Sequence, residues 1–268
     1  MLSIIIMNYK NAPLLRLCLK SLKRVLSNSF AHEIIVVDSS ANLETSSVVS
    51  EEFPGVRYLP FKENVGYTKG VNEGIKISKG DVVFVANPDI IPLRGSLEKM
   101  YSYLKDNPKI GLLGPKLLNF DGSFQQSCFR FYTPLTIIWR RTFLGKLPFM
   151  KSLLDRFQMK DMDLTKPLNV DWLMGSALMA SREAINKVGL MDENLFLYMS
   201  DVDWPRRFWD NGYTVVFYPD VAMYHYHRRQ SRSALGELDA LLNKQTRQHI
   251  KDAIRYFRKY GIREASNI

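Results

Sequence analysis

The sequence predicts an α/β protein with a doubly wound, Rossmann-like sheet that is mostly parallel and flanked by helices. Short apolar runs rich in valine and isoleucine alternate with segments of helical periodicity, the order that produces parallel strands joined by helices. The run Val82–Val85 is apolar without interruption, as expected of a strand buried on both faces. At 268 residues, the chain is long enough for one large domain with its own core.

The first part of the chain repeats one strand and one helix several times. The predicted elements, in order, are a strand at 2–7, a helix carrying Leu15, Leu19, Leu22 and Leu26, a strand at 32–38, a helix at 43–53, a strand at 56–60, a helix at 66–78 and a strand at 81–86. Asp38 ends one of these strands and Asp89 follows another. Carboxyl ends of parallel strands meet at one edge of an open sheet, where such sheets bind ligands. We therefore expect both carboxylates at the binding edge.

The Asn87-Pro88-Asp89 turn is a candidate metal and diphosphate site. Proline removes a backbone donor and ends the strand, so the turn is stiff. Carboxylate and amide oxygens on a stiff turn suit a hard divalent cation, and that cation suits a diphosphate. A strand-ending Asx turn without a ligand is the alternative.

Two common nucleotide motifs are missing. No Gly-x-Gly-x-x-Gly follows the first strand and no Gly-Lys-Ser/Thr motif occurs, which argues against a dinucleotide dehydrogenase and a P-loop kinase. The helical segment 63–74 instead contains Gly66, Gly70 and Gly74. Glycine inside a helix costs about 1 kcal/mol relative to alanine, so these residues indicate close approach of a ligand or of another backbone. A loose loop is the alternative.

The second concentration of polar residues lies near position 200. Strand character returns at 170–180, a helix is predicted to start at 181–183, and Asp201 and Asp203 are followed by Arg207. If a helix begins here, Ser200 or Asp201 caps it and proline 205 lies in its first turn. A carboxylate at a helix start is stabilised as the anion, the form that a general base needs. An acidic helix start paired with Arg207 is the structural alternative.

A strand predicted at 214–218 leads to a cluster of basic side chains. The cluster consists of His225, His227, Arg228, Arg229 and Arg232. Histidine can ligate a metal, and the arginine fork matches phosphate oxygens. The sequence therefore predicts a further part of a metal and phosphate site here.

The charge balance favours an anionic partner. The chain has 37 Lys and Arg against 27 Asp and Glu, a formal net charge of +10. Segment 122–154 contains no acidic residue and mixes cations with aromatic and aliphatic side chains, and the predicted helix at 237–260 has an apolar stripe of Ile250, Ala253, Ile254, Phe257 and Tyr260. Both segments suit a helix lying on anionic lipid. Single-stranded nucleic acid and a buried helix pair are the competing interpretations for segment 122–154.

The remaining features predict an intracellular protein. No apolar run approaches the roughly 18 residues needed to span a bilayer, and the first residues lack the basic start of a signal peptide. The two cysteines indicate no disulfide framework, and Cys18 falls among the apolar positions of a helix. We expect Cys18 to be a core residue in a reducing compartment.

Taken together, these motifs resemble family 2 glycosyltransferases of the GT-A fold, and within them the non-processive, rhamnosyltransferase-like enzymes of bacterial surface-polysaccharide assembly. The resemblance runs from residue 3 to about residue 260. It implies that Asp89 and His225 bind a divalent cation (Mg²⁺ or Mn²⁺) and that Asp201 is the catalytic base. The donor-binding residues that it implies are Asn8, Asp38, Asn64, Gly66, Asn72, Asn87, Arg207, Arg228 and Arg229, and the acceptor-binding residues are Asp171, Trp172 and Asp203.

The resemblance also implies an inverting reaction and two halves of one domain. Residues 1–115 would bind the nucleotide sugar, 116–235 the acceptor, and 236–268 would form a C-terminal amphipathic helix and tail. The donor would be dTDP-L-rhamnose and the acceptor a polyprenyl-diphosphate-linked saccharide, with the enzyme peripheral on the cytoplasmic face of the inner membrane and without a nucleic-acid partner. Another hexosyl donor, or a subunit that binds nucleotide sugar without turnover, is the alternative.

Three positions depart from the pattern of that family. Ser200 replaces the usual glutamate, Trp204 replaces leucine, and Ser39-Ser40-Ala41-Asn42 differs from the family's Asp-Asn-x-Ser-x-Asp turn. The first departure bears on the tuning of Asp201, and the third bears on how the nucleoside is held.

Overall fold

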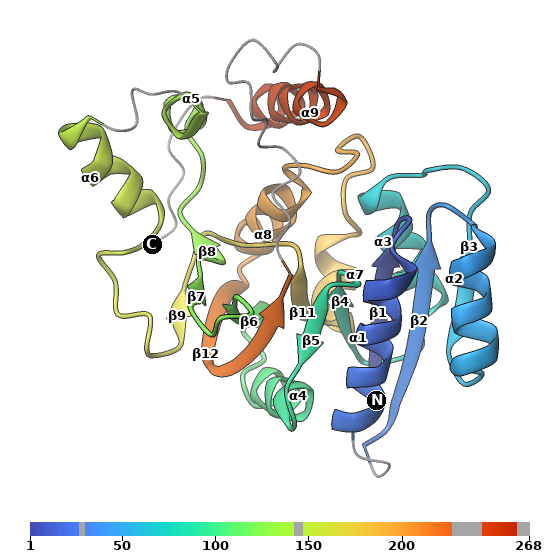
Figure 1. Ribbon diagram of the computed structural model, residues 1–268. Helices are drawn as coiled ribbons and strands as arrows, with labels where there is room; N and C mark the ends of the chain where they lie inside the picture. Colours follow the sequence, from blue (N-terminus) through green and yellow to red (C-terminus); the bar gives the residue numbers. More distant parts are fainter. Residues whose placement is uncertain (27–29, 142–146, 227–242, 262–268) are drawn as a thin grey trace.

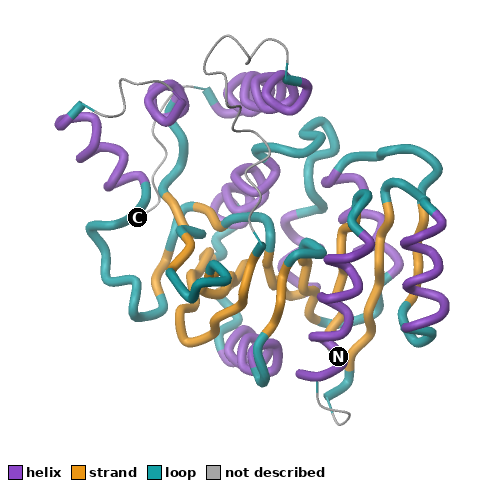
Figure 2. The backbone as a smooth tube through the Cα atoms, viewed as in Figure 1, coloured by secondary structure: helices purple, strands orange, loops and turns teal. Residues whose placement is uncertain are grey.

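A computed structural model describes residues 1–26, 30–141, 147–226 and 243–261 and shows one mixed sheet with helices on both faces (Figures 1 and 2). The order of the main strands across the sheet is β3-β2-β1-β4-β11-β6-β12-β5. In chain order, the strands of this sheet are β1 (Leu2–Asn8), β2 (His32–Asp38), β3 (Arg57–Pro60), β4 (Val82–Ala86), β5 (Ile90–Pro92), β6 (Ile110–Leu118), β7 (Phe124–Gln125), β9 (Leu168–Asn169), β11 (Ala177–Ser181) and β12 (Thr214–His225). A separate small sheet pairs β8 (Cys128–Phe129) with β10 (Trp172–Leu173).

The four strands β3, β2, β1 and β4 pair in parallel, as predicted, and β6 and β12 form a second parallel pair. Successive side chains of a strand point to opposite faces. In β1, Ile4 and Ile6 join one core cluster, whereas Ile5 and Met7 join the cluster on the other face. Because both faces are covered, the strand is apolar without alternation from Ile4 to Met7.

The helices pack against these two faces of the sheet. Helices α1 and α4 cover one face, and α3, α7 and α8 cover the other. The helices are α1 (Ala12–Val25), α2 (Leu43–Ser47), η1 (Val48–Glu52), α3 (Tyr67–Ile77), α4 (Ser96–Asp106), α5 (Pro134–Arg141), α6 (Pro148–Phe157), α7 (Arg182–Val188), α8 (Ser200–Asp210) and α9 (Lys244–Tyr260). The predicted helix at 43–53 is thus an α-helical turn that continues as a short π-helix, η1.

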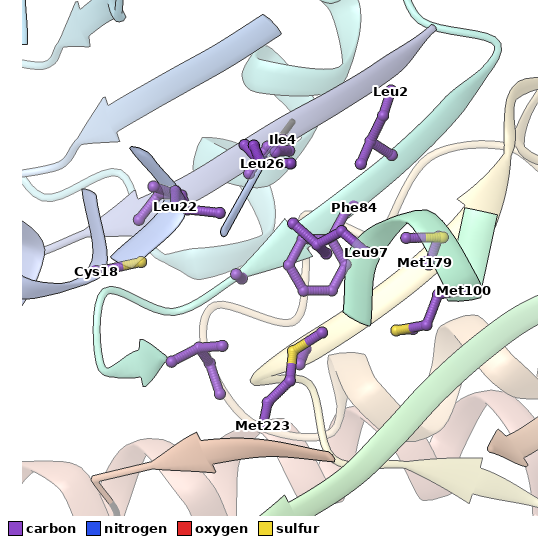
Figure 3. Packing of buried hydrophobic residues seen from close by; sticks show 14 of the residues in the cluster. Leu2, Ile4, Cys18, Leu22, Leu26, Phe84, Leu97, Met100, Met179 and Met223 are labelled. Carbon is purple, nitrogen blue, oxygen red and sulfur yellow. The ribbon is translucent and has the colours of Figure 1, made fainter. Parts of the chain in front are cut away.

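The core beneath α1 and α4 contains Cys18, as predicted. Figure 3 shows Phe84 of β4 at the centre of this cluster, near Leu97, Met100 and Met179. Cys18 is 1% exposed, and burial raises the pKa of its thiol to about 12. A buried thiol with so high a pKa is a packing residue.

Strand β12 is longer than the predicted strand at 214–218. It continues to His225 through a bulge between Tyr218 and Ala222, and its last residues pair with β5, which follows the Asp89 turn. The bulge allows β12 to pair with both β6 and β5, which the local apolar pattern did not indicate. As a result, His225 lies beside Asp89.

Helix α9 leaves Ile250 and Ile254 of its apolar stripe exposed and buries a more polar face. Ile250 and Ile254 are 45% and 48% exposed, whereas Asp252 and Tyr256 are 0% and 1% exposed. The surface under α9 presents backbone N–H groups and the Asp203 carboxylate, so the helix meets it with polar side chains. Figure 1 shows α9 lying across the end of the molecule near α8 and α5.

Within the part of the chain that the structure describes, none of the helices has both the length and the hydropathy required to cross a bilayer.

Candidate active site

Asn8 and Asp38 lie side by side at the carboxyl ends of β1 and β2. Both are 0% exposed, and the amide of Asn8 donates to Asp38 Oδ1 at 3.2 Å. The hydroxyls of Ser40 and Tyr58 also donate to Asp38, at 2.9 and 2.8 Å. Asn8 Oδ1 has no hydrogen-bond partner among the described residues. The pair therefore shapes the edge of the sheet, and its contact with a nucleoside remains a prediction.

The loop before α3 lies beside Ser39 at the same edge of the sheet. Asn64 Oδ1 accepts hydrogen bonds from the N–H of Gly66 at 2.9 Å and from the hydroxyl of Ser39 at 3.2 Å. Gly66 has a φ of 82°, and a Cβ atom there would lie 2.7 Å from the carbonyl oxygen of Phe196. Glycine is therefore required at position 66 both by its backbone conformation and by the close approach of Phe196.

Asn72 has an internal role in this structure. Its side-chain amide forms two hydrogen bonds with the backbone of Met191. Nδ2 donates to the carbonyl oxygen at 2.9 Å, and Oδ1 accepts from the N–H at 3.0 Å. The side chain is 1% exposed. Asn72 thus ties α3 to the segment after α7, and the predicted donor contact of Asn72 is not tested by the structure.

Asp89 and His225 form the candidate cation site. Asp89 Oδ1 is 3.5 Å from His225 Nε2, and it is a buried oxygen without a hydrogen bond from any described residue. Burial raises the pKa of Asp89 to about 6. A divalent cation would supply the positive charge that this carboxylate lacks and would favour its anionic form. The two side chains therefore fit a hard divalent cation whose remaining ligands come from outside the protein.

Gln125 orients the histidine of this pair. Its Oε1 lies 2.6 Å from His225 Nδ1. An amide oxygen accepts, so Nδ1 carries the proton and the lone pair of Nε2 faces Asp89. No group of three or more His, Cys, Asp or Glu side chains with the spacing of a metal site occurs among the described residues. The neighbouring Asn87 faces the same edge, and its N–H donates to the carbonyl oxygen of Ser176 at 3.0 Å.

Asp201 occupies the first turn of α8. The N–H of Gly175 donates to its Oδ2 at 3.3 Å, and a Cβ atom on residue 175 would lie 3.0 Å from Asp201 Cβ. The hydroxyl of Tyr67 donates to the Gly175 carbonyl at 2.6 Å. Burial raises the pKa of Asp201 to about 6, partly opposed by the Gly175 N–H and by the charge of Arg140. A carboxylate with a pKa near 6 is suited to accept a proton at neutral pH.

The start of α8 differs from the prediction. Met199 is the N-cap residue, with a φ of 64° and no side-chain cap, and Pro205 lies inside the helix. The Ser200 hydroxyl donates backwards to the carbonyl oxygen of Leu197 at 3.3 Å. Neither Ser200 nor Asp201 is therefore used as the cap, which leaves the Asp201 carboxylate available for other contacts.

Asp203 and Arg207 face away from Asp201 and pair with each other. Asp203 Oδ2 accepts from Arg207 Nε at 2.9 Å, and Oδ1 accepts from Lys259 Nζ and from the Tyr260 hydroxyl, both at 2.7 Å. Arg207 also donates to the carbonyl oxygen of Val188. In this structure the two residues join α8 to α9 and α7, and their predicted roles in acceptor and donor binding are not tested.

Asp171 and Trp172 lie in a cluster of aromatic rings below α5. Trp172 stacks on Phe129 with ring centroids 4.4 Å apart, and Asp171, which is fully buried, accepts from the N–H of Phe131 at 2.8 Å. The guanidinium of Arg140 lies above the Phe129 ring at 5.8 Å. Trp172 is 5% exposed and packs within this aromatic cluster. Its contact with an acceptor is not tested.

Several predicted residues lie outside the described part of the chain. These are His227, Arg228, Arg229 and Arg232 of the basic cluster, and Lys146 of segment 122–154.

The sequence did not indicate which residues would form hydrogen bonds to the predicted site residues and to their neighbours. Gln125 and His225 are 100 residues apart, and Tyr67 and Gly175 are 108 residues apart. Only Gly175 carried a local signal, because a glycine within a strand-like run indicates close approach of another group.

Comparisons with known proteins address both the sequence and the fold. Residues 3–189, more than half of the chain, match the family described as Glycosyl transferase family 2. The chain is 28% identical over 236 residues to N-acetylglucosaminyl-diphospho-decaprenol L-rhamnosyltransferase of Mycobacterium tuberculosis, a match that covers 84% of this chain and 76% of that protein. It is also 28% identical over 212 residues to the low-salt glycan biosynthesis hexosyltransferase Agl10 of Haloferax volcanii, covering 77% of this chain and 61% of Agl10.

A similar arrangement occurs in a solved structure. The crystal structure of GalNAc-T7 with UDP, GalNAc and Mn²⁺ superposes on this chain with a TM-score of 0.68 at 14% sequence identity. The superposition covers 96% of this chain, which spans about half (48%) of the GalNAc-T7 chain. At this identity the likeness shows a shared fold.

Proposed function

The chain belongs to glycosyl transferase family 2, and we propose that it transfers L-rhamnose from dTDP-L-rhamnose to a polyprenyl-diphosphate-linked saccharide in polysaccharide synthesis. The predicted GT-A-like α/β fold with a C-terminal helix is confirmed. The observation that carries the proposal is Asp201: a carboxylate with a pKa of about 6 that accepts from the N–H of Gly175, whose neighbour Ser176 accepts at its carbonyl from the N–H of Asn87 in the Asp89 turn. One group can accept a proton and the other can hold a cation at a diphosphate.

On the donor side, we assign cation binding to Asp89 and His225. A bound Mg²⁺ or Mn²⁺ would neutralise charge on the leaving nucleoside diphosphate. Asp89 contributes a carboxylate oxygen that has no hydrogen bond from the described residues, and Gln125 keeps the lone pair of His225 Nε2 directed at the same point. Asn8, Asp38 and the Asn64 loop border the edge of the sheet where the nucleoside would lie.

On the acceptor side, Asp201 takes the proton in a single displacement with inversion. The acceptor oxygen forms its bond to the anomeric carbon while the bond from that carbon to the diphosphate breaks. The electron pair of the broken bond leaves with the diphosphate, and the hydroxyl proton passes to an Asp201 oxygen. The N–H of Gly175 holds the carboxylate in place at 3.3 Å.

We assign the acceptor-binding part to residues 116–235 and the donor-binding part to residues 1–115. The relative from Mycobacterium tuberculosis has a lipid-diphosphate saccharide in its name, which supports the same class of acceptor for this chain. Arg140 lies over the aromatic cluster of Phe129, Tyr132 and Phe157 and is close enough to lower the pKa of Asp201. A cation there would attract the diphosphate of the acceptor toward the base.

The same acceptor requires a membrane surface, and we propose that the enzyme binds peripherally to the cytoplasmic face of the inner membrane. The outer face of α9 presents Ile250 and Ile254, which are 45% and 48% exposed. The exposed basic residues of this helix are Lys244, Arg247, Lys251, Arg258 and Lys259. Exposed aliphatic side chains among cations fit the interface of an anionic bilayer, where each cation contributes about 1 kcal/mol.

Vesicle sedimentation tests this surface. We expect the protein to pellet with vesicles that contain anionic lipid and to stay in solution with neutral vesicles. The double variant Lys251→Glu and Ile254→Ser should reduce the pelleted fraction, whereas Lys23→Glu at the exposed end of α1, on the other face of the sheet from α8, should not. Equal loss for both variants would contradict an assignment to α9.

Transfer assays test the proposed reaction. Purified protein would be given a panel of nucleotide sugars and a polyprenyl-diphosphate saccharide, with and without Mg²⁺ or Mn²⁺. We expect metal-dependent transfer from dTDP-L-rhamnose, which Asp201→Asn reduces by about 10²-fold or more. Asp161→Asn, a change at a surface position, serves as the control.

Two other outcomes would replace this proposal. The hexosyltransferase Agl10 is as similar in identity as the rhamnosyltransferase is, so turnover of a hexosyl donor in place of rhamnose would keep the mechanism and change the sugar. Binding of nucleotide sugars without turnover of any of them would indicate a binding subunit.

A further inference from the structure

The carboxylate of Asp252 in α9 holds the backbone of a distant loop. It accepts hydrogen bonds from the N–H groups of Phe196, Leu197 and Tyr198 at 3.4, 3.2 and 3.1 Å. Gln248 donates a further bond to it at 2.8 Å. Asp252 is 0% exposed. Only an acceptor with several lone pairs can satisfy successive N–H groups that point to one place, and a carboxylate does this best.

The loop that Asp252 holds, residues 192–199, connects the two sides of the active site. On the donor side, its Phe196 carbonyl accepts from the N–H of Tyr67 at 2.8 Å, and its Leu195 carbonyl accepts from the Thr68 hydroxyl at 2.6 Å. Gly66 allows this contact because it has no Cβ atom. The loop therefore lies directly against the first turn of α3.

At its other end, the loop leads into the helix that carries Asp201. Its last residue, Met199, has a φ of 64° and accepts hydrogen bonds from the N–H groups of Val202 and Asp203 at 3.2 and 2.8 Å. A non-glycine residue with positive φ needs support from its surroundings. The bonds from the preceding residues to Asp252 supply that support.

Further contacts join α9 to the same loop. Lys259 pairs with Asp192 at 2.8 Å, and Arg255 donates to the Asn194 carbonyl oxygen. These groups are partly exposed, so each ion pair contributes little by itself. The fully buried Asp252 carboxylate is the contact whose loss would leave several backbone donors without partners.

We propose that Asp252 is a positioning residue for sugar transfer, setting the place of the Asp201 carboxylate through residues 192–199. The inference rests on the proposed role of Asp201 as the base. It makes α9 part of the active site although none of its side chains reaches the reacting atoms. A misplacement of about 1 Å in such a site can slow a reaction by about 10²-fold.

Asp252→Asn tests the proposal, because asparagine keeps the size of the side chain and loses the charge and one acceptor. We expect kcat to fall by about 10- to 100-fold. The acidic limb of the pH profile of kcat should also move, while the affinity for the free nucleoside diphosphate, measured by calorimetry, changes by less than about threefold. Asp161→Asn, the same chemical change at an exposed aspartate, serves as the matched control.

Hydrogen exchange separates this proposal from the assignment of function. In Asp252→Asn, amide exchange of peptides covering residues 195–199 should become at least about tenfold faster, whether or not a donor is turned over. If the wild-type protein transfers no sugar, the proposed function fails. If it transfers sugar and the variant has unchanged kcat, pH profile and exchange, the positioning role is wrong.

A second variant covers the case in which Asp252→Asn does not fold. Asp252→Glu keeps the charge and lengthens the side chain by one methylene, so it should fold and lower kcat less than asparagine does. A loss of activity that matches the loss of folded protein, with no shift of the pH profile, would indicate a purely structural residue.

Discussion

Two aspartate carboxylates in the first turn of α8 differ in their hydrogen-bond partners and in their surroundings. Asp203 faces α9 and is bonded by Arg207, Lys259 and Tyr260. Asp201 faces Gly175, forms no ion pair with any described residue, and has a pKa raised to about 6 by burial. The bonded carboxylate builds the fold, and the carboxylate left short of partners is available for chemistry.

The surroundings of Asp203 are balanced in charge as well as in hydrogen bonds. Although burial opposes it, the carboxylates of Asp192 and Asp203 raise the pKa of Lys259. Burial and the charge of Asp203 raise the pKa of Tyr260. Lys259 and Tyr260 thus both remain protonated donors at neutral pH. Asp201 has no comparable set of donors, so the difference lies in the neighbours and not in the helix.

The largest effect should come from removing the charge of Asp201. Asp201→Asn should lower kcat by about 10²- to 10⁴-fold, the contribution expected of a general base, while the protein remains folded. Steady-state transfer assays and circular dichroism measure the two properties. Retention of more than about a tenth of wild-type kcat would mean that another group accepts the proton.

The second effect concerns stability. Asp203→Asn should lower the free energy of unfolding by about 3 kcal/mol, because it leaves Arg207 and Lys259 with a weaker buried partner. Glu73→Gln, which breaks the partly exposed pair of Glu73 with Lys76, is the control and should change that free energy by less than about 0.5 kcal/mol. Urea unfolding measures both variants. Similar losses for both would remove the distinction between the two faces of α8.

The third effect is the pH dependence of the rate. The base must be deprotonated, so kcat/KM should rise with pH through about 6 and then level off. Between pH 7 and pH 5 the rate should fall by about tenfold, since each pH unit below the pKa reduces the anion about tenfold. A pH series with the substrates well below their KM values measures this limb. A profile that stays flat down to pH 4.5 would contradict a raised pKa at Asp201.

The smallest effect concerns how much the ionised carboxylate of Asp201 destabilises the folded state. The folded pKa of Asp201, about 6, lies above the ordinary value of 3.8, so ionisation increasingly penalises the folded state between pH 3.8 and about 6, and fully above that. Asp201→Asn should therefore be more stable than the wild-type protein at pH 8, by about 1–2 kcal/mol after allowance for partial exposure. The difference should vanish well below the ordinary pKa, near about pH 2.5, where the aspartate is neutral in both the folded and the unfolded state. A variant less stable at pH 8 would contradict this account.

The sequence predicted the parts of the molecule that local patterns determine. Strands such as Val82–Ala86 could be predicted because both of their faces are buried, which makes an uninterrupted apolar run. The segments that carry Asp38 and Asp89 were predicted for similar reasons, since polar residues that follow such runs fall at one edge of the sheet, whereas Asp201 was predicted as a carboxylate at the start of a helix.

The features that the sequence did not predict depend on distant partners. The apolar stripe of α9 could be read from the sequence, but the burial of Asp252 could not, because the surface that α9 meets is polar. The N-cap of α8 was assigned to a hydroxyl or a carboxylate, whereas a methionine in the left-handed region takes that place because the preceding loop is held from outside. Periodicity reports how apolar a helix face is, and it does not report the chemistry of the surface on which that face will lie.

The hydrogen bonds between Asp252 and the loop at residues 196–198 also determine the order in which parts of the molecule can form during synthesis. The loop leaves the ribosome 54 to 56 residues before its acceptor does. Until α9 follows, the N–H groups of Phe196, Leu197 and Tyr198 must remain bonded to water and the start of α8 is unsupported. A nascent chain can therefore complete its sheet while the start of α8 still lacks the support of α9. Under the proposed function, sugar transfer would begin only after α9 has been synthesised.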